Sequence, residues 1–205
     1  MKKTAYVLLV VVGMSLSLSS VAQDEPEFKS IISLNGGFSL VGALFDLPDA
    51  TGTGDVSSFS APAIQVNYDY YFSSWFTLGA AFSVQFMGIE YTDYYDDFSA
   101  DTWNHKTNVT RLNIGTRALF HYANEGRMDL YSGLRLGLTN WNVSTNNAST
   151  SYDPSQDITF SEGIVFAPQL ILFGAQGYFT DNIGANFELT VGAPHFFSIG
   201  LNYRF

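Results

Sequence analysis

The feature that most constrains the fold is an alternation of apolar and polar residues with a period of two, which recurs from about residue 29 to residue 205. In residues 76–86 the even positions read Phe, Leu, Ala, Phe, Val, Phe, and the odd positions read Thr, Gly, Ala, Ser, Gln. A helix would scatter these two sets around its surface, whereas a β-strand places them on opposite faces. The alternation therefore predicts strands with one apolar and one polar face.

Eight segments carry this pattern. We expect strands at residues 29–41, 61–72, 75–89, 109–122, 128–141, 164–179, 182–191 and 196–205. The sixth is the least regular, and we expect a bulge near residues 171–176. Short connections (73–74, 123–127, 180–181) alternate with long ones (42–60, 90–108, 142–163). Short periplasmic turns and long external loops are typical of outer-membrane barrels, although the connection at 192–195 is short where a long one is expected.

The first residues have the layout of a secretory signal peptide. Two lysines come first, an unbroken apolar run covers residues 6–12, and small residues lead up to Ala22. The apolar run is shorter than the roughly 20 residues that a spanning helix needs. We therefore expect a signal peptide over residues 1–22 and one β-barrel domain over residues 23–205. The chain has no cysteine, which excludes disulfides and thiolate metal sites.

Composition narrows where such strands can fold. Charged residues are 14% of the chain and aromatic residues 16%, which is unusual for a soluble acidic domain and ordinary for strands that face lipid. Lipid cannot satisfy open backbone groups, so only helices and closed barrels span membranes. We therefore expect an all-β fold, an eight-stranded antiparallel up-and-down transmembrane β-barrel, and a monomer. Nineteen acidic residues against nine basic ones exclude nucleic acid as a partner.

The C-terminal strand adds a more specific signal. Apolar side chains occupy alternate positions from Phe197 to the terminal Phe205. This pattern, the Tyr71-Phe72-Ser73 turn and the strand alternation together resemble the small OmpA/OmpX/OmpW-type barrels and the related outer-membrane β-barrel domain family of Bacteroidota. The resemblance implies a location in the cell outer membrane, with outer-membrane lipid and the barrel-assembly machinery as partners. It also implies that Phe205 is an assembly signal.

The polar faces of the expected strands carry seven charged residues. They are Asp69, Arg111, Arg117, Asp129, Arg135, Glu188 and Arg204. One interpretation is an ion-conducting lumen; the other is a packed core of ion pairs. The packed core is favoured, because an eight-stranded barrel is just wide enough for side chains to fill it and an unpaired buried charge is strongly unfavourable. We expect Glu188 and Arg204, on adjacent strands, to be one such pair.

The long connections are acidic and rich in aromatic residues. Their acidic residues are Asp46, Asp49, Asp55, Glu90, Asp93, Asp96, Asp97, Asp101, Asp153, Asp157 and Glu162, with Lys106 as the single basic residue. Clustered carboxylates suit divalent cations such as Ca²⁺ or Mg²⁺. The favoured interpretation is instead a solvated loop with an aromatic girdle where strands leave the bilayer. We assign no metal ligand and no cofactor.

Catalytic chemistry has weak support. His195 and Ser198 are three residues apart, which in a strand would place them on opposite faces. We therefore expect no enzyme and no catalytic residue. The predicted function is a non-enzymatic envelope or surface-interaction role, or passage of small solutes. The first alternative is a lipid-modifying enzyme, which needs a His/Ser/acid set at the rim. The second is a lateral-opening transporter of small apolar molecules, which needs an apolar channel in the upper barrel.

Overall fold

The computed structural model describes residues 28–45, 55–96, 101–149 and 158–205, so the expected signal peptide lies outside the described residues. The strands of the barrel are β1 (Ser30–Phe38), β3 (Ala63–Ser73), β4 (Phe76–Asp96), β5 (Asp101–Glu125), β6 (Met128–Ser149), β7 (Ile158–Tyr178), β8 (Ile183–Gly192) and β9 (Phe197–Arg204). A short strand β2 (Asp55–Ser60) and a six-residue helix α2 (Leu40–Phe45) lie between β1 and β3.

The strands close into a barrel, as the sequence predicted. Each strand from β3 to β9 pairs antiparallel with the next, and β1 pairs with both β3 and β9. The order is therefore an up-and-down barrel of eight strands, with the last strand beside the first. The additional strand β2 precedes β3 along the chain and pairs with β4 alone. Closure leaves no free edge within the barrel itself, which is what a membrane demands.

The outer face is apolar and the inner face polar. On β1 and β3 the burial alternates residue by residue, and the outward residues Leu34, Val66 and Tyr68 are exposed while the inward Asn35 and Gln65 are buried. Aromatic rings of Trp75, Phe76 and Phe120 pack together at the end of the barrel that holds the short turns. No helix in the described part of the chain is long and apolar enough to cross a membrane.

An apolar exterior around a polar, closed interior, with an aromatic girdle, is the architecture of outer-membrane barrels. The chain is an integral β-barrel protein of the outer membrane.

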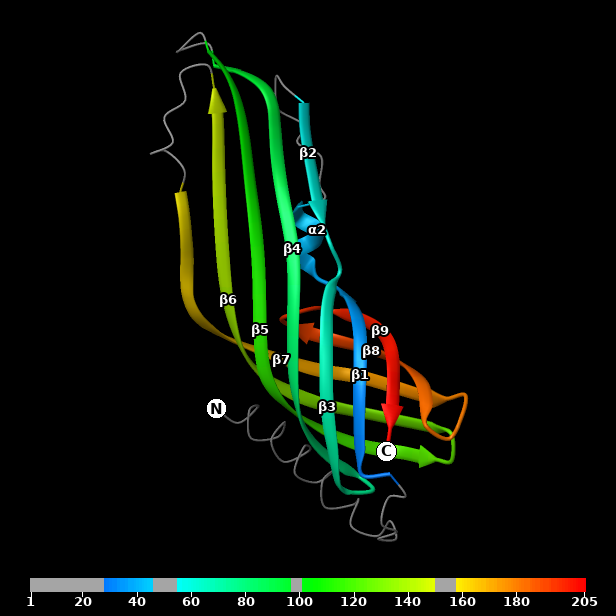
Figure 1. Cartoon of the computed structure of the whole chain (residues 1–205). Coiled ribbons are helices and arrows are strands. Elements are labelled where there is room, and N and C mark those ends of the chain that lie inside the picture. Colours follow the sequence, from blue (N-terminus) through cyan, green and yellow to red (C-terminus); the bar gives the residue numbers. More distant parts are fainter. Residues whose placement is uncertain (1–27, 46–54, 97–100, 150–157) are drawn as a thin grey trace, which may run out of the picture.

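The barrel has a tall side and a short side (Figure 1). The strands β4, β5, β6 and β7 have 21, 25, 22 and 21 residues. In contrast, β1, β3, β8 and β9 have 9, 11, 10 and 8 residues. The tall strands continue beyond the ends of the short ones at the external side (Figure 1). We call this extension the projecting sheet: β2 with residues 88–96, 101–110, 140–149 and 158–167 of the tall strands.

The projecting sheet corrects the expected loops. Residues 90–108 and 142–163 were predicted as long connections, but much of both segments is paired strand. The expected connection 42–60 likewise contains α2 and β2. Outside the bilayer both faces of a sheet meet water, so the hydrogen-bonded ladder continues while the apolar alternation that reveals a strand disappears.

The irregularity of the sixth expected strand is confirmed in β7. Its register shifts between Ile171 and Phe173 against β8, and β6 shifts opposite it between Tyr131 and Gly133. A side chain at Gly174 would put its Cβ 2.1 Å from the Cε2 atom of Tyr131. Glycine therefore lets the Tyr131 ring lie across β7 and reach the middle of the lumen.

Candidate functional site: the lumen and its external end

A cluster of charged side chains from three strands fills the middle of the lumen. The Arg117 Nε atom lies 3.0 Å from Asp69 Oδ1, and its Nη2 atom donates to Glu188 Oε1 at 2.6 Å. The Tyr131 hydroxyl donates to the same Glu188 oxygen at 2.9 Å. These four residues, the central cluster, are at most 4% exposed. A fully buried arginine therefore lies between two carboxylates at this level, and every charge of the cluster has a partner of opposite sign.

A second cluster closes the periplasmic end. Asp129 accepts hydrogen bonds from the Tyr71 hydroxyl at 2.7 Å and from the Gln176 amide at 2.5 Å, and its carboxylate lies 2.8 Å from His121 Nδ1. The other imidazole nitrogen lies 3.1 Å from the Thr77 hydroxyl. The hydroxyl, imidazole and carboxylate stand in the order of a catalytic triad. Thr77 is fully buried, so solvent does not reach its hydroxyl in this arrangement, and we call this hydrogen-bonded group the plug.

The external half of the lumen holds two arginines with neutral partners. Arg135 donates to the side-chain oxygens of Gln65 and Asn113. Arg111 donates to the backbone carbonyl of Pro194, and its guanidinium lies 5.4 Å from the centroid of the Trp141 ring. Both arginines are at most 3% exposed, and neither forms an ion pair with a carboxylate of the described residues.

The structure does not form the expected Glu188–Arg204 pair. Arg204 lies at the periplasmic rim, where its Nε atom donates to the Asp181 carbonyl at 2.6 Å and its guanidinium stacks 3.8 Å from the centroid of Tyr178. Glu188 binds Arg117 instead, and Asp129 binds His121. Alternation identifies the inward face but not the height, because tilted strands carry neighbouring inward residues to different levels. The expected Glu188–Arg204 pair was therefore wrong.

The expectation that His195 and Ser198 face opposite ways was also wrong. Both are buried on the lumen side, because His195 lies in the turn between β8 and β9, where the period of two does not apply. Ser198 is the register partner of Glu188, and His195 Nε2 lies 4.0 Å from Glu188 Oε2, too long for a hydrogen bond. Burial lowers the pKa of His195, and Glu188 opposes that shift. Neither the Ser198 hydroxyl nor the imidazole has a hydrogen-bond partner among the described residues.

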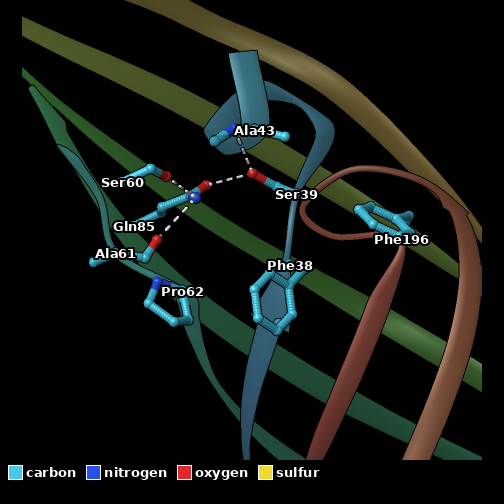
Figure 2. Close-up of a pocket in the computed structure, with 10 residues that line it drawn as sticks. Phe38, Ser39, Ala43, Ser60, Ala61, Pro62, Gln85 and Phe196 are labelled. Carbon is cyan, nitrogen blue, oxygen red and sulfur yellow. Dashed lines mark hydrogen bonds between the residues drawn. The ribbon is translucent and has the colours of Figure 1, made fainter. Parts of the chain in front are cut away.

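One seam in the barrel wall is sealed by a side chain that the sequence analysis did not single out. Pairing between β1 and β3 ends at Gly37 and Ala63, and α2 begins just above. Gln85 closes the gap: its oxygen accepts from the Ser39 hydroxyl at 2.9 Å, and its nitrogen donates to Ser60 at 3.3 Å and to the Ala61 carbonyl at 3.0 Å (Figure 2). The break after Ala61, before a proline that cannot donate, is the sequence signal for this seam.

A cavity of about 110 Å³ lies at the seam, beside Phe38, Pro62 and Phe196 (Figure 2). Gln85 lines this cavity, and its side-chain amide is hydrogen-bonded to Ser39, Ser60 and Ala61. The continuous apolar channel that a lateral-opening transporter needs is therefore interrupted at this point by hydrogen-bonded polar groups.

Few of the acidic side chains of the expected loops lie among the described residues. Glu90 forms an exposed ion pair with Lys106 at 3.0 Å. In the described part of the chain no group of three or more His, Asp or Glu side chains is arranged to hold a metal ion. Five of the other ten acidic residues, Asp46, Asp49, Asp97, Asp153 and Asp157, lie in the segments 46–54, 97–100 and 150–157, outside that part.

Comparison with known proteins gives similarity in fold. No protein-family model matches the chain, and no curated protein does. Ail, the attachment invasion locus protein of Yersinia pestis, is 14% identical with a TM-score of 0.46, over 89% of this chain and 100% of that one. Neisserial surface protein A is 13% identical with a TM-score of 0.39, over 86% and 95%. The translocator domain of the autotransporter NalP from Neisseria meningitidis is 11% identical with a TM-score of 0.36, over 99% and 98%.

Proposed function

We propose that the chain is a non-enzymatic surface-interaction protein, and that the projecting sheet is its binding element. The observation that carries the proposal is the free edge of β7. Gln169 is the first β7 residue that pairs with β8, whereas residues 158–168 have β6 as their only partner strand among the described residues. On that side, the backbone N–H and C=O groups of residues 162–168 therefore have no partner strand among the described residues.

The free edge has the chemistry of a strand-addition site. Ile164, Val165 and Phe166 follow one another along it and are 72%, 44% and 61% exposed. An extended segment of a partner would hydrogen-bond to the edge and place alternate side chains against these residues. Water-exposed edges are usually protected by lysine or by a covering loop. The described part of this edge carries neither lysine nor arginine.

The filled lumen supports this interpretation over solute passage. The central cluster and the plug around Asp129 stand one behind the other along the lumen, and their charged groups are hydrogen-bonded or ion-paired. A solute would have to displace those contacts, and breaking a buried ion pair costs roughly 3–5 kcal/mol. A barrel of this kind is best suited to presenting its external part.

The proposal is tested by attachment of cells that display the full chain. The variant is Ile164→Lys with Val165→Lys, which places two lysines on the free edge. The matched control is Thr107→Lys with Asn108→Lys, which adds the same charge to β5, an inner strand of the same sheet. Attachment is measured between cells and to protein-coated and glycan-coated surfaces.

We expect the parent and the control to attach and the edge variant to lose most of its attachment. Equal attachment of all three chains would contradict the role of the edge. A parent that attaches no better than cells without it would contradict a surface-interaction role altogether.

A further inference from the structure

A cavity of about 340 Å³ lies at the turn between β8 and β9. On one side it is bounded by the end of β8 and the turn, residues 190–194 with Phe196. On the other side are residues 39–41, where β1 leads into α2. Arg111, on β5, reaches across the lumen to the cavity and donates to the Pro194 carbonyl.

Arg111 is a buried cation without a counter-ion among the described residues. Its residue is 3% exposed, and its partners are the Pro194 carbonyl and the face of Trp141. The buried acids of the lumen have other partners: Asp69 and Glu188 bind Arg117, and Asp129 binds His121. Arg135 also lacks a carboxylate partner, so among the described side chains the external half of the lumen carries excess positive charge. Because an unpaired buried charge is unfavourable, this region favours an anion.

The rest of the cavity is mostly apolar, with Ser39 and Thr190 as its other polar side chains. Leu40 and Val191 line it and are 69% and 61% exposed on the outer surface, and Val41, Ala193 and Phe196 complete the apolar walls. The apolar part of a ligand would therefore lie toward the bilayer and its charged group toward the lumen. We propose that this cavity binds a single-chain amphipathic carboxylate, a fatty-acid anion of the outer leaflet, with the carboxylate on Arg111 and the hydrocarbon chain against Leu40 and Val191.

The guanidinium suits this ligand. Arginine has five N–H donors in a planar fork that matches a carboxylate, and the hydrogen bond from Arg111 to Pro194 uses one of them. The neighbouring Trp141 ring gives a direct optical signal, since an anion at Arg111 changes the surroundings of the indole.

The experiment uses the refolded full chain in nanodiscs of neutral phosphatidylcholine, titrated with dodecanoate while tryptophan fluorescence is recorded. Trp141→Phe identifies the part of the signal that comes from this site. Dodecanol has the same chain without the charge, and acetate has the charge without the chain. Arg111→Gln removes the cation and keeps a hydrogen-bond donor, whereas Val41→Trp narrows the cavity with Arg111 intact. Arg127→Gln, at the exposed periplasmic turn, is the matched control.

We expect saturable binding of dodecanoate by the parent and by Arg127→Gln. We expect binding to be at least about tenfold weaker in three cases. Arg111→Gln and the dodecanol titration each lose one charge-assisted contact, and Val41→Trp loses the room for the hydrocarbon chain. Acetate should bind far more weakly than dodecanoate. The proposal is overturned if dodecanol or acetate binds as tightly as dodecanoate, if the signal survives Trp141→Phe, or if Val41→Trp binds as the parent does. If Arg111→Gln does not refold, the dodecanol and acetate titrations, Trp141→Phe and Val41→Trp still test the proposal.

Discussion

The tall and the short sides of the barrel are made of the same kind of strand but differ in length. We expect the function to lie in the projecting sheet, which the longer strands form. Inside the bilayer both sides follow one rule, an apolar outer face and a polar inner face. Above the bilayer the tall strands β4 to β7 continue and remain paired, but the apolar alternation of the barrel ends there (Figure 1). A membrane demands both a closed ladder and an apolar surface, whereas water demands neither closure nor apolarity. The projecting sheet is therefore free to keep open edges that the barrel cannot have.

The largest expected difference between the two regions concerns their ion pairs. Glu188→Ala should destabilise the barrel by about 3–5 kcal/mol, because it leaves Arg117 with one carboxylate fewer in a buried site. The matched change is Glu90→Ala, which removes the exposed partner of Lys106 in the projecting sheet and should cost about 1 kcal/mol or less. Thermal and urea unfolding in detergent give both values. Similar losses for the two variants would mean that the central cluster is hydrated and not buried.

The second difference concerns the outer face. Leu134→Arg, on the lipid-facing side of β6 within the barrel, should cost roughly 2–4 kcal/mol, since a cation at mid-bilayer is desolvated. Ile164→Arg, on the projecting part of β7, should cost close to zero because that position meets water. Unfolding in lipid vesicles measures both. A tolerated Leu134→Arg would show that the assignment of the lipid-facing residues is wrong.

The third test removes part of the projecting sheet. Ser144 and Thr159 are register partners, so residues 144–159 can be replaced by a two-residue Asn-Gly turn between Val143 and Phe160. The shortened chain should keep its barrel, with a change of roughly 1 kcal/mol or less in the free energy of unfolding. Because residues 160–168 remain, attachment should persist if Ile164, Val165 and Phe166 bind the partner, and its loss would place the binding residues within 144–159. Loss of refolding would show that the sheet is part of the folding unit.

The smallest effect on stability is expected at the C-terminus. The backbone of Phe205 bonds to Ser30, so Phe205 helps to join β9 to β1, and its ring stacks on Tyr203. Deleting Phe205 should lower the amount of barrel in the outer membrane more than it lowers the stability of protein refolded in detergent, because it resembles an assembly signal. Quantitative immunoblots of membrane fractions beside unfolding curves make the comparison. Equal amounts of barrel in the outer membrane with and without Phe205 would contradict its role as an assembly signal.

The sequence predicted the part of the molecule that the membrane constrains. The sequence predicted the eight strands, their order and the irregularity of β7, because lipid on one side and a polar lumen on the other impose an alternation of period two. The projecting sheet could not be predicted, since both of its faces meet water and no apolar alternation is imposed on its sequence. Inward residues such as Glu188 were recognised, but their partners were not, because pairing depends on strand tilt. The sealing role of Gln85 and the burial of His195 on the lumen side were not predicted. Both residues lie where the regular pattern breaks, Gln85 at the seam and His195 in the turn.

The central claim is that the barrel is closed by its side chains and acts through its external part. The most direct test is the conductance of the refolded full chain in a planar bilayer, with Glu188→Ala measured beside it. Because Arg117 bridges Asp69 and Glu188 across the lumen, the parent should show no steady conductance. Glu188→Ala should melt at a lower temperature and show at most brief openings. A steady, ohmic channel in the parent, with a Glu188→Ala variant that melts like it, would contradict the account and make the barrel a pore.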